Sequence, residues 1–430
     1  MTLVLVVLFG LMLLGIPVAF AILSAGMAYL ATTGGSMLVV AQRLIYGLNS
    51  FTLLAVPLFI LVGNLMDFGG ISKRLTDWAK SILGWLPGGL GIVTVFSCAI
   101  FAALTGSGPA TVAAIGSIML PSMLKAGYSR ETSAGLVASA GALGPIIPPS
   151  IPMIIYGVTM NLSIPAMFMA GVVPGLVIAL ALSLVNVVFA YRNPEVLKHA
   201  KTMKFDFKES MKLFWKALGA LGLPVLILGG IYGGIFTPTE SAAVGIVYAL
   251  ILGFALKELK VKDLPKILIN SLKTSTMVNF IIAAASLFSW VVSKSQIGIV
   301  ISNAFISFVG GSQALYLFVL VVVLLIVGCL MDNVAATLIL APILIPVGIA
   351  LGCNELHIGM LFCICLVVGF VTPPFGYNLF TAVSISGLNF KQIVKGALPF
   401  LLTEILLLFV FAYVPGIITW LPRLVHLPPA

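Results

Sequence analysis

Long uninterrupted apolar runs alternate with short polar segments along the whole chain, as in residues 3–30, 176–191 and 315–330. These runs are as long as a membrane-crossing helix, which needs about 20 apolar residues. Strands of a membrane barrel would instead alternate apolar and polar residues at period two. A backbone in lipid must satisfy its own hydrogen bonds, so the runs predict helices.

The pattern predicts nine full spans, which we place at about 3–30, 51–68, 131–160, 164–191, 215–233, 239–256, 274–293, 357–386 and 396–420. The apolar stretch 91–123 is too short for two spans and is broken by Gly106-Ser107-Gly108-Pro109, so it predicts a re-entrant hairpin. A second stretch, 313–351, has Asp332 and Asn333 in its middle and predicts a second hairpin.

Composition supports a membrane protein. Hydrophobic residues make up 61% of the 430 residues and charged residues 8%, where a soluble domain carries about 25% charge. This excludes a soluble enzyme and a disordered chain, and leaves the lipid bilayer as the main solvent. The five cysteines lie in or beside apolar runs without a zinc or disulfide spacing.

The net charge of +10 comes from basic residues in short loops between apolar runs. The positive-inside rule explains such loops, so no nucleic-acid partner is expected. If five basic clusters share the cytoplasmic side, the N-terminus is cytoplasmic and the C-terminus periplasmic. The second hairpin then enters the membrane from outside. No ATP-binding G-x-x-x-x-G-K-[ST] motif is present, so an ion gradient or a partner must drive any transport.

The chain also contains an internal repeat, because glycines and prolines recur 225 positions further on. The pairs are Pro121 and Pro346, Gly127 and Gly352, Gly144 and Gly369, Pro148-Pro149 and Pro373-Pro374, Gly171 and Gly396, and Pro174 and Pro399. The predicted topology makes the two copies inverted. Inverted repeats with interrupted helices are typical of secondary transporters, whose substrate and ion sites lie near the midplane.

This repeat predicts five regions. They are an N-terminal span and connecting arm (1–50), repeat one (51–191), basic cytoplasmic loops with two linking spans (192–273), repeat two (274–420) and a C-terminal tail (421–430). The predicted fold class is therefore an all-α membrane protein with two re-entrant hairpins and two interrupted helices.

Each repeat has two helix breaks that could meet, and a proline at a break frees backbone carbonyls. Freed carbonyls and hydroxyls suit a dehydrated Na⁺. The predicted ligands of site one are Thr105, Ser107, Gly144, Ile147 and Pro149, and those of site two are Asp332, Asn333, Gly369, Thr372 and Pro374. The alternative is that these glycines and prolines only kink helices for packing.

Several polar side chains have more than one possible role. Asp332 could carry a proton, help to bind Na⁺ or cap the second hairpin helix, since an ionisable group at membrane depth is a functional candidate by default. Asp67 and Glu240 fit capping or interfacial roles. Ser150 and Asn378 lie at the two breaks and are candidates to contact an anionic substrate, or to bond neighbouring helices.

Several strings resemble the large membrane subunit of the tripartite ATP-independent periplasmic (TRAP) transporters. They are GSGPATVAAIG at 106–116, GPIIPPSIP at 144–152 with Tyr156-Gly157 after it, and GIFTPTESAA at 234–243. The likeness covers nearly the whole chain.

The resemblance implies an elevator mechanism, in which hairpins and broken helices carry substrate across a fixed scaffold in the bacterial inner membrane. It also implies Na⁺ coupling and import of a carboxylate-bearing solute delivered by a periplasmic binding protein. A small membrane subunit of four spans is the second implied partner. Sialic acid is slightly favoured over C4-dicarboxylates. An H⁺-coupled transporter of the same fold and a passive channel stay as alternatives.

Overall fold

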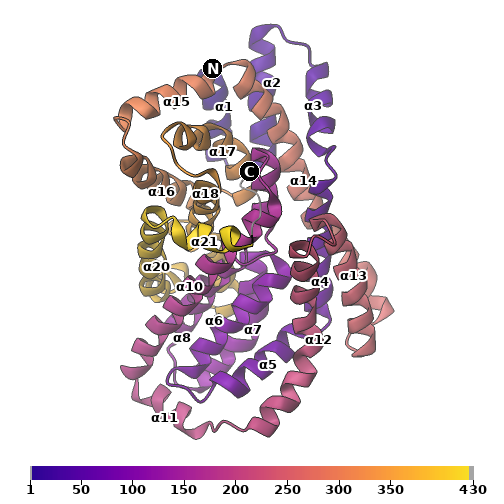
Figure 1. Ribbon diagram of the computed structural model, residues 1–430, viewed down its shortest axis with the longest axis vertical. Coiled ribbons are helices and arrows are strands. Elements are labelled where there is room, and N and C mark those ends of the chain that lie inside the picture. The colour runs from indigo at the N-terminus through magenta and orange to yellow at the C-terminus, as the bar shows by residue number, and fades with distance from the viewer. Residues whose placement is uncertain (1, 426–430) are drawn as a thin grey trace.

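The computed structural model describes residues 2–425, and the regular elements in that range are all helices. Seven of these helices are long and apolar enough to cross a membrane, or eight spans result if the bent pair Leu38–Leu48 and Thr52–Phe68 counts as one. The helices form an elongated bundle (Figure 1). The predicted class, an all-α membrane protein, is confirmed.

The first apolar run forms two helices, α1 (Thr2–Leu13) and α2 (Val18–Thr33), which pack against each other. Gly15, at a φ of +80°, reverses the chain between them, and Pro17 precedes α2. The predicted single span over 3–30 is therefore wrong. The turn consists of Gly and Pro and adds no polar residue, so the hydropathy of the run does not reveal it. The chain then continues through α3 (Leu38–Leu48), η1 (Thr52–Leu54), α4 (Ala55–Phe68) and the amphipathic α5 (Ile71–Leu83).

The predicted hairpin of repeat one forms α6 (Gly89–Thr105) and α7 (Gly108–Lys125), which pack side by side. The interrupted helix follows as α8 (Arg130–Ala140), η2 (Gly141–Leu143) and α9 (Ile151–Met160), and α10 (Ile164–Tyr191) closes the repeat. The hairpin and the interrupted helix are both confirmed.

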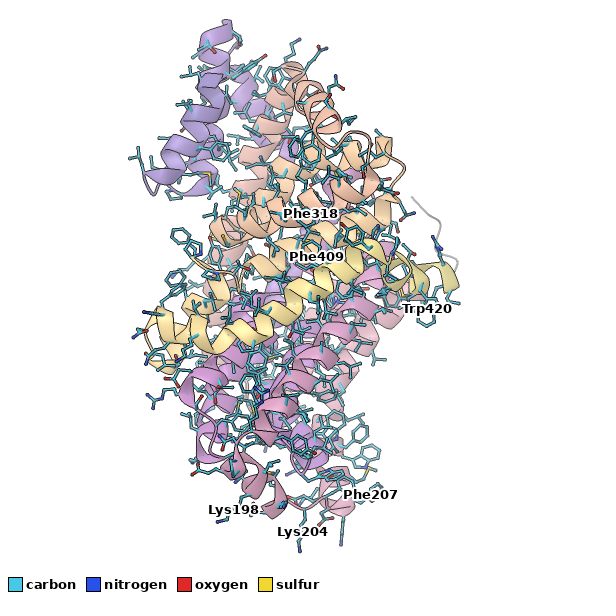
Figure 2. All side chains as sticks on the ribbon, turned by 90° about the vertical axis from the view of Figure 1, so that its left-hand side faces the viewer. Lys198, Lys204, Phe207, Phe318, Phe409 and Trp420 are labelled. Atoms are coloured by element: carbon cyan, nitrogen blue, oxygen red, sulfur yellow. The ribbon has the colours of Figure 1, made fainter. Side chains whose placement is uncertain are left out.

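The linking region contains α11 (Pro194–Thr202), α12 (Phe207–Tyr232) and α13 (Pro238–Ala255). Lys198, Lys204 and Phe207 lie together at one end of the molecule (Figure 2). At the start of α13, the Thr237 side chain accepts from the Glu240 backbone and the Glu240 carboxylate accepts from the Thr237 backbone. The capping role predicted for Glu240 is thus confirmed.

A short η3 (Val261–Asp263) leads into the long helix α14 (Leu264–Lys294) and then α15 (Ile297–Phe308), which was not predicted. Repeat two contains the hairpin α16 (Gln313–Leu330) and α17 (Asn333–Ala350), the interrupted helix α18 (Glu355–Gly369) and α19 (Tyr377–Ser386), and α20 (Phe390–Tyr413). The predicted last span, 396–420, is too long at its end, because the chain breaks at Pro415 and a separate amphipathic α21 (Gly416–Leu424) follows.

The repeat includes the boundaries of whole helices as well as single glycines and prolines. Helix α17 begins and ends 225 positions after α7, and α18 begins 225 positions after α8. Packing between the copies is reciprocal: α9 packs on α17 as α19 packs on α7, and α8 packs on α20 as α18 packs on α10. Such reciprocal contacts are what a two-fold relation produces. In Figure 1 the first hairpin lies in the lower half of the molecule and the second in the upper half.

Candidate functional site

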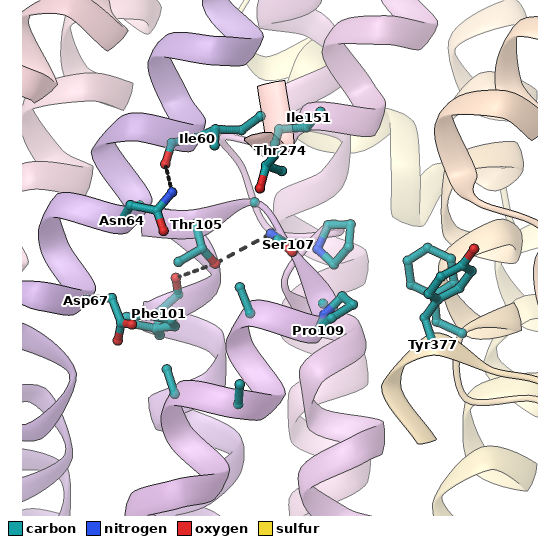
Figure 3. Close-up of a pocket in the computed structure, with 18 of the residues that line it drawn as sticks. Ile60, Asn64, Asp67, Phe101, Thr105, Ser107, Pro109, Ile151, Thr274 and Tyr377 are labelled. Atoms are coloured by element: carbon teal, nitrogen blue, oxygen red, sulfur yellow. Dashed lines mark hydrogen bonds between the residues drawn. The ribbon is translucent and has the colours of Figure 1, made fainter. Parts of the chain in front are cut away.

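A cavity of about 680 Å³ lies where the two hairpins meet α4, α5 and α14 (Figure 3). Both hairpin tips line it, and each interrupted helix contributes residues beside its break. The cavity therefore joins both hairpins and both interrupted helices to α4, α5 and α14. Its volume falls within the range of small-ligand pockets, about 300–1,000 Å³.

The first hairpin tip presents hydroxyls to this cavity. Helix α6 ends at Thr105, Gly106 reverses the chain at a φ of +59°, and the extended Ser107 precedes α7. The Thr105 hydroxyl lies 3.2 Å from the Thr111 hydroxyl, which donates to the Ser107 carbonyl at 2.8 Å. Ser107 makes no side-chain capping bond, so its hydroxyl is available to a ligand.

The first break touches this tip through backbone atoms. A Cβ on Gly144 would lie 2.7 Å from the Ser107 carbonyl oxygen, and a Cβ on Gly106 would lie 2.9 Å from the Pro149 carbonyl oxygen. Glycine is required for approaches this close. The fold thus brings Thr105, Ser107, Gly144 and Pro149 of predicted site one together, while the Ile147 side chain packs against Gly175 of α10.

The second hairpin tip presents an acid and an amide. Asp332 caps α17, because its Oδ1 accepts from the Val334 backbone N–H at 2.8 Å. The capping alternative for Asp332 is therefore confirmed, and the residue also lines the cavity. The neighbouring Asn333 is 2% exposed, and neither atom of its amide has a hydrogen-bond partner among the described residues.

The second break is more open than the first. Gly369 packs on the last turn of α16, where a Cβ would lie 2.5 Å from the Gly328 carbonyl carbon. The Thr372 hydroxyl donates to the Val368 carbonyl at 3.0 Å, and Pro374 is exposed. Of predicted site two, only Asp332 and Asn333 line the cavity, and the break contributes Phe370 and Tyr377 instead.

The two predicted substrate contacts do not line the cavity. Ser150 is fully buried and donates to the Pro145 carbonyl at 2.5 Å, which closes the first break. Asn378 is also fully buried, and its amide donates to the Ala138 carbonyl of α8 at 3.0 Å. In this conformation both side chains bond the protein's own backbone, as the alternative interpretation expects.

Sequence reasoning missed three polar residues that the helices preceding each hairpin add to the cavity. They are Asn64 of α4, Thr274 of α14 and Lys73 of α5. Asp67 of α4, expected in a capping or interfacial role, also lines the cavity, and its carboxylate accepts from the Ser72 hydroxyl at 3.3 Å. The Leu-Met-Asp string at Asp67 recurs at Asp332, and both aspartates line the cavity.

Sequence reasoning also missed Glu404, in the middle of α20. It is 1% exposed, and both its carboxylate oxygens lack a partner among the described residues. The signal was an acidic residue inside an apolar run.

Comparison with known proteins matches almost the whole chain to one family of transporters. The family described as "Tripartite ATP-independent periplasmic transporter, DctM component" matches residues 5–417. The C4-dicarboxylate TRAP transporter large permease protein DctM of Pseudomonas aeruginosa is 39% identical, over 93% of each chain. The sialic acid TRAP transporter large permease protein SiaM of Vibrio cholerae is 33% identical, over 96% of each chain.

A third relative is longer than this chain. The isethionate TRAP transporter permease protein DctMQ of Oleidesulfovibrio alaskensis is 39% identical over 94% of this chain, which spans 64% of that relative's length. The match to the family covers both hairpins, both interrupted helices and the cavity between them. The chain is therefore a transporter rather than an enzyme, and it belongs to the DctM component family of the tripartite ATP-independent periplasmic transporters.

Proposed function

We propose that this chain is the large membrane subunit of a Na⁺-coupled secondary transporter that imports an organic anion across a bacterial inner membrane. The observation that carries the proposal is one cavity lined by both hairpin tips and by residues beside both breaks. A site built from two repeats and facing a scaffold is the arrangement that alternating access requires.

Ion coupling is supported by the oxygen-rich first site. The hydroxyls of Thr105 and Ser107 lie beside a break in which Gly144 touches the tip backbone. Na⁺ is bound by such carbonyl and hydroxyl oxygens at interrupted helices. We assign one Na⁺ to this site. We assign a second to the region between the second hairpin tip and the second break, with Asp332, Asn333 and the Thr372 hydroxyl as ligands.

The substrate is an organic acid in its anionic form. The three relatives are named for a C4-dicarboxylate, sialic acid and isethionate, which share an anionic group. The cavity offers the exposed Lys73 and the N-terminal ends of α7 and α17, where the helix dipole favours negative charge. A carboxylate such as sialic acid stays our preferred cargo, delivered by a periplasmic binding protein.

The elevator mechanism assigns the moving part to the hairpins and interrupted helices, and the scaffold to α4 and α14. The cavity extends to Gly70, Ser72 and Lys73 at the start of α5. The basic pattern predicts this helix on the cytoplasmic side, so we interpret the conformation as inward-facing. The small membrane subunit of four spans is the proposed scaffold partner.

The test is uptake into liposomes that contain the chain with its small membrane subunit and a loaded binding protein. We expect uptake to require external Na⁺ and to stop when Na⁺ gradients are collapsed. Uptake that persists without Na⁺ and follows a pH gradient would instead support the H⁺-coupled alternative. Uptake that needs no gradient would support a passive channel.

Removal of single hydroxyls tests the two ion sites. Ser107→Ala and Thr372→Ala should each raise the Na⁺ concentration for half-maximal uptake by about tenfold, because one oxygen ligand worth roughly 1–1.5 kcal/mol is lost. Expression should not change, since neither hydroxyl bonds a distant segment. Unchanged Na⁺ titrations in both variants would leave only a packing role for these positions.

A further inference from the structure

Asn378 is buried and does not line the cavity, so contact with a substrate does not account for its position in this structure. It follows the second break in sequence, yet its side chain reaches the end of α8 beside the first break, where its amide donates to the Ala138 carbonyl at 3.0 Å. The two residues are 240 positions apart. The side chain is 0% exposed, so this hydrogen bond is shielded from competing water.

Two glycines of the first repeat leave room for this amide. A Cβ on Gly108, the first residue of α7, would lie 2.8 Å from Asn378 Oδ1. A Cβ on Gly141, at the start of η2, would lie 3.3 Å from Asn378 Nδ2. The amide therefore fills the space between the hairpin tip and the end of α8, and Gly108 directly follows the predicted ion ligand Ser107.

The same residue closes the second break with its backbone. The Asn378 N–H donates to the Phe370 carbonyl at 3.0 Å, across the interruption between α18 and α19. Phe370 and Tyr377 both line the cavity, and their ring centroids are 5.3 Å apart. Asn378 thus contacts the first break through its side chain and the cavity wall of the second break through its main chain.

We propose that Asn378 is a positioning residue that couples the two breaks, so that an ion bound at the first break orders the second. An ion at Ser107 and Gly144 would fix the tip and the end of α8, and these would hold the Asn378 amide. The held residue would in turn fix Phe370 and Tyr377. A second ligand then meets a segment that is already ordered, which is positive cooperativity. This inference rests on the proposed Na⁺ coupling.

The chain supplies a matched control in Asn186 of α10. It too is 0% exposed, its amide donates to the Gly88 carbonyl at 2.8 Å, and its Oδ1 has no partner among the described residues. Glycines flank it as well, since a Cβ on Gly91 would overlap Asn186 Oδ1. Asn186 lies outside the cavity lining, so its removal should perturb packing without affecting communication between the breaks.

The experiment measures the accessibility of the second break while the first break is changed by mutation. Na⁺ is the ligand that is titrated. Phe375, which is 54% exposed in the second break, is replaced by cysteine in the full-length chain in lipid nanodiscs. The rate of maleimide alkylation is measured as Na⁺ replaces K⁺. The five native cysteines are buried, and the parent chain without Phe375→Cys gives the background rate.

In this background we expect Na⁺ to slow alkylation. Ser107→Ala should raise the Na⁺ concentration for half-protection by about fivefold or more, a typical coupling between sites. In an Asn378→Ala chain the same Ser107→Ala change should shift it by less than about twofold, whereas an Asn186→Ala chain should keep the full shift. Asn378→Leu keeps the branched shape of the side chain but cannot donate a hydrogen bond. It should behave like Asn378→Ala and replaces it if the alanine variant folds poorly.

The outcomes separate the two proposals. If Na⁺ does not change the alkylation rate while uptake still requires Na⁺, only the coupling role of Asn378 is overturned. If uptake also needs no Na⁺, the Na⁺ coupling fails, and the role of Asn378 fails with it. If Na⁺ protects the introduced thiol but Ser107→Ala shifts the titration equally with and without Asn378, only the coupling role is overturned. The role is also overturned if Ser107→Ala produces no shift in the background with Asn378.

Discussion

Replacing Gly396 by alanine should destabilise the protein by about 1–3 kcal/mol, the usual cost of forcing an extra carbon into a packed contact. A Cβ at Gly396 would overlap both the carbonyl oxygen and the carbonyl carbon of Glu131. Both atoms belong to the backbone of α8, so no side chain can turn aside. The interrupted helix would have to separate from α20, which holds it in place.

The measurement is the midpoint of thermal unfolding of the purified chain in detergent, together with uptake in liposomes. Gly229→Ala is the matched control, because Gly229 is also helical and has nothing within 4 Å of a Cβ. That variant should raise stability by about 0.5–1 kcal/mol, since alanine loses less backbone entropy in a helix. Equal midpoints for the two variants would contradict the close approach of α8 and α20.

Replacing Asp332 by asparagine should reduce uptake at limiting Na⁺ by about tenfold or more, the effect of losing one charged ligand. Asparagine caps a helix as well as aspartate does, so the bond to the Val334 backbone can still form. The substitution therefore removes the charge at the cavity while keeping the start of α17. Thermal stability should change little.

Asp206→Asn is the control for this second prediction. Asp206 caps α12 in the same way, accepting from the Lys208 and Glu209 backbones, but it is exposed and does not line the cavity. Its substitution should leave both uptake and stability near their original values. An Asp332→Asn chain with normal Na⁺ dependence would show that Asp332 acts only as a cap.

Breaks that contain glycine and proline were predictable because their cause is local. The tip at Gly106 and Ser107 and the interruption after Gly144 were located to within a few residues, since these residue types disfavour a continuous helix wherever they occur. The same reasoning could have separated α1 from α2 at Gly15 and Pro17. There the even hydropathy of the run suggested one span instead.

The members of each site were harder to predict, because membership depends on distant packing. Ser150 and Asn378 are polar residues beside breaks, yet each bonds a backbone carbonyl instead of facing the cavity. Lys73 and Thr274 lie outside the repeats' break motifs and still line the cavity, because α5 and α14 pass beside the hairpin tips.

The order of residues alone identifies a multi-span membrane protein with two related units, each with a hairpin and an interrupted helix. Apolar run length and the positions of Gly and Pro act on the backbone locally, so they can be interpreted without knowing the neighbours. Only the tertiary structure decided which break touches which tip, and that the Asn378 amide crosses to α8. Those contacts join residues up to 240 positions apart, and such pairings depend on how whole helices pack rather than on any local pattern.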